Sequence, residues 1–119
     1  MAQVLVVDDD EHGRLFLATV LKTLNYKVVQ APTALEGLGL MDAGMAFDLL
    51  ITDLLMPVID GTSFIKLVRK QRPQLPIIVV SAHLPDRDEG QILLERVLVL
   101  RKPLSYQQLA EAVKHTFTL

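Results

Sequence analysis

Acidic, hydroxyl and amine side chains follow four apolar runs of this 119-residue sequence, each near the point where the run ends. These residues are Asp8 and Asp9, Asp53, Ser81, and Lys102. Carboxylates that lie close together raise each other's pKa values unless a cation joins them. Oxygen ligands suit a hard cation such as Mg²⁺, which keeps water molecules for a substrate phosphate. A lysine adds a point charge for a phosphoryl oxygen. The residue types therefore indicate metal-assisted phosphate chemistry, if the four runs end at one edge of the fold.

The apolar runs have the length and composition of buried strands. They are Val4–Val7, Asp48–Thr52, Pro76–Val80 and Val97–Leu100, and a further short run covers Lys27–Gln30. Segments with apolar residues at helical spacing separate them. Because the runs are continuous rather than alternating, helices should cover both faces of a parallel sheet. The sequence predicts an α/β fold of five strands and five helices.

Capping patterns predict where several helices begin. Thr33 with Glu36, and Ser105 with Gln108, have capping-box spacing. The fourth helix should begin near 84–86 and is interrupted by Gly90. The residues expected to face inward are Leu35, Leu38 and Met41 in the second helix, and Tyr106, Leu109, Val113 and Phe117 in the last.

Asp53 is poorly explained by packing, because it stands at the end of a buried strand and faces a loop. Parallel strands end on the same side, where open α/β sheets bind ligands. The other candidates have structural alternatives. The acidic stretch at residues 8–11 could be a solvated helix cap, Lys102-Pro103 a surface turn, and Ser81 a cap of the following helix.

From Asp53 to Gly61 the sequence reads Asp-Leu-Leu-Met-Pro-Val-Ile-Asp-Gly, which resembles the receiver domain of bacterial response regulators. The resemblance covers essentially the whole chain and implies a flavodoxin-like, doubly wound sheet of order 2-1-3-4-5. It implies that Asp53 accepts a phosphoryl group. It also implies that Asp8, Asp9, Asp53 and the backbone carbonyl of Leu55 bind Mg²⁺, for which Mn²⁺ could substitute.

The same resemblance implies that Lys102 and Ser81 contact the phosphoryl group and that the Lys102-Pro103 peptide is cis. The implied donor is a histidine kinase, a histidine phosphotransfer protein or a small acyl phosphate. The implied output is a downstream effector protein, or a homodimer, acting through the fourth helix, fifth strand and fifth helix. Such a protein phosphorylates and dephosphorylates itself and is not a conventional turnover enzyme.

Three features depart from the family pattern. Val99 stands where many receivers carry an aromatic switch residue, and residues 94–96 replace a small Gly-Ala step. Leu55 and His83 occupy positions that tune hydrolysis of the phosphoryl bond in the family. We expect the apolar Leu55 to shield that bond from water.

Composition limits the other possibilities. A net charge of -2 argues against nucleic-acid binding, and the absence of cysteine excludes disulfides. With no signal peptide or bilayer-length apolar run, we expect one cytoplasmic receiver domain over residues 1–119. Two rival functions remain: a phosphorylation-independent interaction module on the same fold, and an aspartyl-nucleophile phosphohydrolase, which would need a general acid where Leu55 stands.

Overall fold

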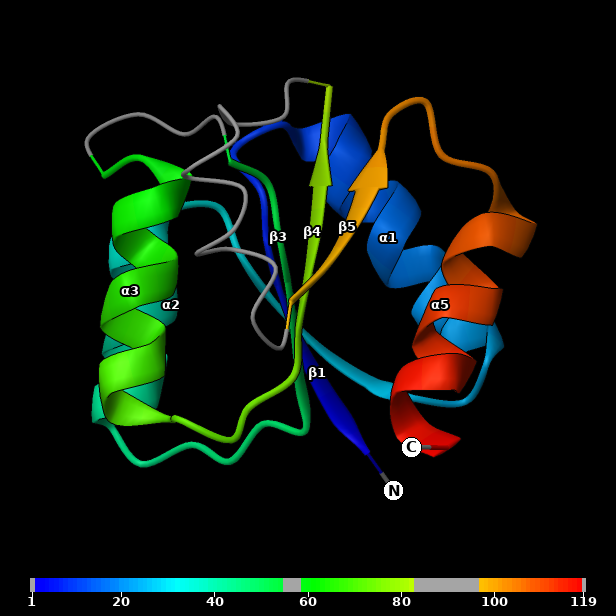
Figure 1. The fold of residues 1–119 in the computed structure, drawn as a ribbon. Helices are drawn as coiled ribbons and strands as arrows, with labels where there is room; N and C mark the ends of the chain where they lie inside the picture. Colours follow the sequence, from blue (N-terminus) through cyan, green and yellow to red (C-terminus); the bar gives the residue numbers. More distant parts are fainter. Residues whose placement is uncertain (1, 55–58, 83–96, 119) are drawn as a thin grey trace.

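The computed structural model describes residues 2–54, 59–82 and 97–118 (Figure 1). Its elements are β1 (Gln3–Val7), α1 (Glu11–Thr23), β2 (Lys27–Ala31), α2 (Ala34–Asp42), β3 (Leu49–Thr52), α3 (Gly61–Gln71), β4 (Ile77–Ser81), β5 (Val97–Arg101) and α5 (Tyr106–Thr118). The strands form one parallel sheet in the order β2-β1-β3-β4-β5. The predicted strand order is confirmed. Four helices lie within the described residues, and the segment in which we expected the fourth of five helices lies outside them.

Two helix layers enclose the sheet: α1 and α5 cover one face, and α2 and α3 cover the other (Figure 1). Along β1 the side chains alternate between these layers. Leu5 and Val7 face the cluster of α2 and α3, whereas Val4 and Val6 face that of α1 and α5. All four residues are buried, which explains why the run is continuously apolar.

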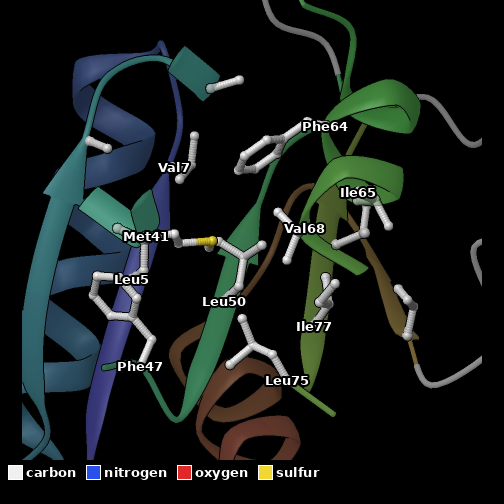
Figure 2. Packing of buried hydrophobic residues seen from close by; sticks show 14 of the residues in the cluster. Leu5, Val7, Met41, Phe47, Leu50, Phe64, Ile65, Val68, Leu75 and Ile77 are labelled. Atoms are coloured by element: carbon white, nitrogen blue, oxygen red, sulfur yellow. The ribbon is translucent and has the colours of Figure 1, made fainter. Parts of the chain in front are cut away.

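The core on the α2 and α3 side packs around Phe64, which is completely buried. Figure 2 shows Phe64 and Val68 extending from α3 toward Val7 and Leu50 of the sheet. Burying an aromatic or aliphatic side chain of this size stabilises the fold by about 1.5–3 kcal/mol. This packing holds α3 and the central strands in a fixed relation, which in turn fixes the ends of β1 and β3.

The helix ends follow the capping patterns of the sequence. The Oγ1 of Thr33 accepts a hydrogen bond from the Glu36 N–H at 3.1 Å. Ser105 and Gln108 form both bonds of a capping box, at 2.9 and 3.1 Å. Within the described part of the chain, no helix has the length and apolar character needed to cross a membrane.

Two predictions about helix faces were wrong. Leu35 is 56% exposed, because α2 instead turns Ala34, Gly37 and Met41 toward the sheet. Tyr106 is 47% exposed, because the whole first turn of α5 is accessible to solvent.

Candidate functional site

The register of the sheet brings the predicted residues to one edge, which we call the carboxyl edge because the strands end there. Val7 pairs with Thr52, so Asp8 and Asp53 follow neighbouring positions of β1 and β3. The Asp53 N–H donates to the Val7 carbonyl at 3.2 Å. On the other side, the Lys102 N–H donates to the Ser81 carbonyl at 3.0 Å.

Lys102 forms an ion pair with the carboxylate of Asp53. Its Nζ donates to Asp53 Oδ2 at 2.8 Å and lies 3.7 Å from Asp8 Oδ2. Asp53 is only 9% exposed. Ser81 is fully buried at the end of β4, which lies between β3 and β5. The predicted acceptor, lysine and serine thus come from β3, the loop after β5, and β4.

The carboxylate of Asp8 is buried but only partly hydrogen-bonded. Its Oδ1 accepts a hydrogen bond from the Asp10 N–H at 2.9 Å. Its Oδ2 is buried and has no hydrogen-bond partner among the described residues, since 3.7 Å to Lys102 is too long. Burial, the largest influence, raises the pKa of Asp8 above its usual value of 3.8. A buried charge without full compensation is costly to fold, and such groups are typical of functional sites.

Lys102 provides the positive charge of the site. Burial acts to lower its pKa, but the hydrogen bond to Asp53 and the charge of Asp8 outweigh burial and raise the pKa above its usual value. The ammonium therefore stays protonated at neutral pH. The Lys102-Pro103 peptide is cis, as predicted.

The acidic residues fit a hard cation only in part. Asp9 is exposed, and within residues 2–54, 59–82 and 97–118 no three acidic, histidine or cysteine side chains form a group that could hold a metal ion. Leu55, whose carbonyl was expected to contribute, lies outside these residues. Oδ2 of Asp8, which has no hydrogen-bond partner among the described residues, nevertheless offers a hard oxygen ligand beside Asp53. Mg²⁺ prefers donors of this type.

Arg14 supports Asp8 and was not predicted, whereas a helix cap within residues 8–11 was one of the alternatives that the sequence left open. The Nη1 of Arg14 donates to the Asp8 carbonyl at 2.9 Å, and its Nε donates to Gln30 Oε1 at 3.3 Å. Asp10 caps α1 by accepting a hydrogen bond from the Gly13 N–H at 2.9 Å. The cap is visible in the sequence as an acidic residue before a helix. The contact between Arg14 and Asp8 uses a main-chain carbonyl, which no side-chain pattern reveals.

A cavity of about 520 Å³ adjoins the site. Asp8, Gly13 and Lys102 line one part of it, and Phe16 and Leu104 line an apolar part. The carboxyl edge is therefore reachable by a ligand group from the side of α1.

The chain resembles known proteins in sequence and in fold. The sequence model of the family described as "Response regulator receiver domain" matches residues 4–114. Sensor kinase CckA of Brucella abortus is 31% identical over 115 residues, which is 95% of this chain and 12% of that protein. Sensor histidine kinase TmoS of Ectopseudomonas mendocina is 35% identical over 120 residues, covering 98% of this chain and 12% of that protein. The chain thus spans about an eighth of the length of these relatives.

Solved structures show the same fold. Chemotaxis protein CheY4 of Vibrio cholerae is 29% identical, with a TM-score of 0.86 and 98% of both chains covered. A response regulator receiver protein from Pseudomonas putida is 31% identical, with a TM-score of 0.85 and 96% of both chains covered.

Proposed function

This chain belongs to the response regulator receiver domain family, and we propose that it receives a phosphoryl group on Asp53 in two-component signalling. The observation that carries the proposal is the Asp53 carboxylate held 2.8 Å from the Lys102 ammonium. Beside it lies Asp8 Oδ2, which has no hydrogen-bond partner among the described residues. In the proposed reaction this arrangement would supply a nucleophile, a fixed positive charge and a further anionic ligand at one edge of the sheet.

The transfer is a displacement at phosphorus. One oxygen of Asp53 forms a bond to phosphorus while the bond between phosphorus and the donor's nitrogen or oxygen breaks, and the donor keeps that electron pair. Charge spreads over the equatorial oxygens in the transition state, so the protein contributes chiefly position and positive charge.

Lys102 and Ser81 supply the polar contacts in this proposal. Lys102 moves its ammonium from the Asp53 carboxylate to an oxygen of the new acyl phosphate, which keeps its charge paired. Ser81 is buried on the neighbouring strand, where its hydroxyl can donate to another phosphoryl oxygen. Both movements draw the ends of β4 and β5 toward the site, which would bias a two-state output surface.

Asp8 and Asp53 would hold a divalent cation, Mg²⁺ or Mn²⁺, with Asp9 and the Leu55 carbonyl as further predicted ligands. When bound, the cation neutralises the carboxylates and the charge of the phosphoryl oxygens. Asp8 would take part through Oδ2, the oxygen that has no hydrogen-bond partner among the described residues.

The donor would be a histidine kinase or a phosphotransfer protein, and the output surface would include β5 and α5. Leu98 and Tyr106 are 38% and 47% exposed there. Val99, at the position of the family's aromatic switch residue, is half-buried against the core. Output here would therefore rest on movement of β5 and its neighbours and would not need rotation of an aromatic ring.

The proposal is tested by intact mass after incubation with acetyl phosphate and Mg²⁺. The wild type should gain the mass of one phosphoryl group, and Asp53→Ala should gain none. The matched control is Asp48→Ala, which removes an aspartate from the opposite end of β3 and should label like the wild type. If Asp53→Ala labels as the wild type does, Asp53 is not the acceptor. If no protein labels under conditions that label other receivers, the interaction-module alternative is favoured.

The lifetime of the acyl phosphate is a separate part of the proposal. Leu55 lies outside the described residues, and we expect its apolar side chain to slow hydrolysis by excluding water. Leu55→Asn should lose the label faster than the wild type in a time course of intact mass. Equal or slower loss in the variant would contradict this role.

A further inference from the structure

The first turn of α1 lies directly against the Asp8 carboxylate, because residue 13 has no side chain. A Cβ added to Gly13 would lie 2.9 Å from Asp8 Oδ2 and 3.1 Å from Asp10 Oδ2. The first distance is shorter than real Cβ atoms show, so any side chain at residue 13 requires Asp8 or the helix to move.

Asp8 has little freedom to move while keeping its present contacts. Its Oδ1 is bonded to the Asp10 N–H at 2.9 Å, and its carbonyl is held by Arg14 at 2.9 Å. The side chain is 1% exposed, so it cannot turn into solvent without leaving the site. A side chain at residue 13 would therefore displace Oδ2, which forms the ion pair with Lys102 and has no hydrogen-bond partner among the described residues.

We propose that Gly13 is a positioning residue of the phosphoacceptor site. The space left by its missing side chain lets Asp8 direct Oδ2 toward Lys102 and a divalent cation. The inference rests on the proposed function, because it concerns the carboxylate that would hold that cation. It predicts that Gly13→Ala weakens divalent-cation binding although the substituted residue contacts no cation itself.

Gly39 offers a matched control. It lies inside α2, is exposed, and would have no atom within 4 Å of an added Cβ. Gly13→Ala and Gly39→Ala make the same change inside a helix, so both gain helix propensity. They differ in whether the new methyl group meets the carboxylate of Asp8.

The test is titration of the metal-free proteins with Mn²⁺, with free ion measured by electron paramagnetic resonance. Gly13→Ala should bind Mn²⁺ about ten-fold more weakly than the wild type, at the lower end of the 10–100-fold losses seen when the support of a metal ligand is changed. Gly39→Ala should bind like the wild type. A second measurement is the carbon-13 NMR chemical shift of the Asp8 side-chain carboxyl in the metal-free protein. This chemical shift should change in Gly13→Ala and stay unchanged in Gly39→Ala.

A double variant separates positioning from general disturbance. In an Asp8→Asn background, Gly13→Ala should cause no further loss of Mn²⁺ affinity if it acts through Asp8. A loss of the same size in both backgrounds would overturn the proposal. Equal Mn²⁺ affinity of the wild type, Gly13→Ala and Gly39→Ala would also overturn it, and would leave the proposed function standing. A wild type that binds no Mn²⁺ would overturn both the metal site and the role of Gly13, and the wild-type titration alone distinguishes this case.

Discussion

The two ends of the sheet both carry charged residues beside a cavity, but they use them differently. At the carboxyl edge, a cavity of about 520 Å³ adjoins Asp8 and Lys102, and one oxygen of Asp8 has no hydrogen-bond partner in the part of the chain that the structure describes. At the opposite end, which we call the amino edge, a cavity of about 440 Å³ adjoins Asp48 and Arg72.

The charged groups of the amino edge join elements of the fold. The Nη2 of Arg72 donates to the carbonyls of Met41 and Met45 at 3.0 and 2.9 Å, which ties the ends of α2 and α3 together. Asp48 Oδ2 accepts a hydrogen bond from the Gln3 N–H at 2.8 Å. Charged residues and a cavity are therefore common to both ends of the sheet. The end that we propose to be functional differs by its buried carboxylate, which is incompletely hydrogen-bonded. Sites of this kind lower stability in return for function.

The largest effect should come from removing the Lys102 ammonium at the carboxyl edge, and it should fall on the rate of phosphorylation. Lys102→Ala should slow phosphorylation by acetyl phosphate about 10²–10³-fold, the range for losing one preorganised charge donor in a transition state. The rate of mass increase measures this effect. Lys114→Ala, on the exposed surface of α5, is the control and should label at the wild-type rate. A Lys102→Ala rate within a factor of two of the wild type would contradict the account.

At the amino edge the expected effect falls on stability. Arg72→Ala removes two hydrogen bonds and should lower the free energy of unfolding by about 1–3 kcal/mol. Labelling of the folded variant should not change. Urea unfolding measures the loss, and the neighbouring exposed Gln71→Ala should stay within about 0.5 kcal/mol of the wild type. If Arg72→Ala instead abolished labelling without loss of stability, the amino edge would serve phosphorylation and not the stability of the fold.

Asp8→Asn should raise the free energy of unfolding, whereas Arg72→Ala should lower it. Burial raises the Asp8 pKa, so the charged form is disfavoured in the folded state. The contribution of the Asp8 carboxyl to the free energy of unfolding is then most favourable at low pH, and it is lost as pH rises through the folded-state pKa. In metal-free buffer at neutral pH, Asp8→Asn should be more stable than the wild type by about 0.5–2 kcal/mol, a common range for stabilising changes.

Urea unfolding of both proteins across pH measures this difference. The gain should disappear below the usual pKa of 3.8, where the wild-type carboxyl is also protonated. A variant that is less stable than the wild type at neutral pH would show that the Asp8 charge stabilises the fold, contrary to the comparison drawn here.

The smallest effect concerns a carboxylate near the start of α3 that is fully bonded. Asp60 accepts hydrogen bonds from the Ser63 N–H and hydroxyl at 2.9 and 3.1 Å, and the backbone bond chiefly lowers its pKa below 3.8. Its stabilisation is therefore present above pH 3.8 and is lost as pH falls through the folded-state pKa. Asp60→Ala should cost about 1 kcal/mol at neutral pH, as for other N-caps.

The measurement is the difference in unfolding free energy between the wild type and Asp60→Ala at neutral and acidic pH. That difference should shrink with acid, the reverse of the trend for Asp8→Asn. Asp60→Asn keeps an acceptor for the Ser63 N–H and should recover most of the loss. A difference that grows with acid would contradict the assignment.

Much of the fold and part of the site could be predicted from the sequence. The parallel sheet and the meeting of Asp8, Asp53 and Lys102 follow from continuous apolar runs that end in polar residues. The strand order rested partly on the resemblance to receiver domains. The inward face of α2 could not be predicted from apolarity, because Leu35 and Leu38 lie on different sides of a helix that is apolar almost all round. Gly37, which packs against Val7, occupies the buried position instead.

The supporting residues were missed for a different reason. Arg14 and Arg72 bond to main-chain carbonyls, which any residue type provides, so no pairing of side chains reveals them. Gly13 acts through the volume it leaves empty, which becomes visible only when Asp8 has been placed against it.

The central claim is that a carboxylate oxygen of Asp53 forms the new bond to phosphorus. Borohydride reduction of the acetyl phosphate-treated protein converts an aspartyl phosphate to homoserine, and peptide mass spectrometry then locates it. We predict homoserine at position 53 alone, formed only when Mg²⁺ is present. Homoserine at another aspartate, or equal labelling without a divalent ion, would contradict the account.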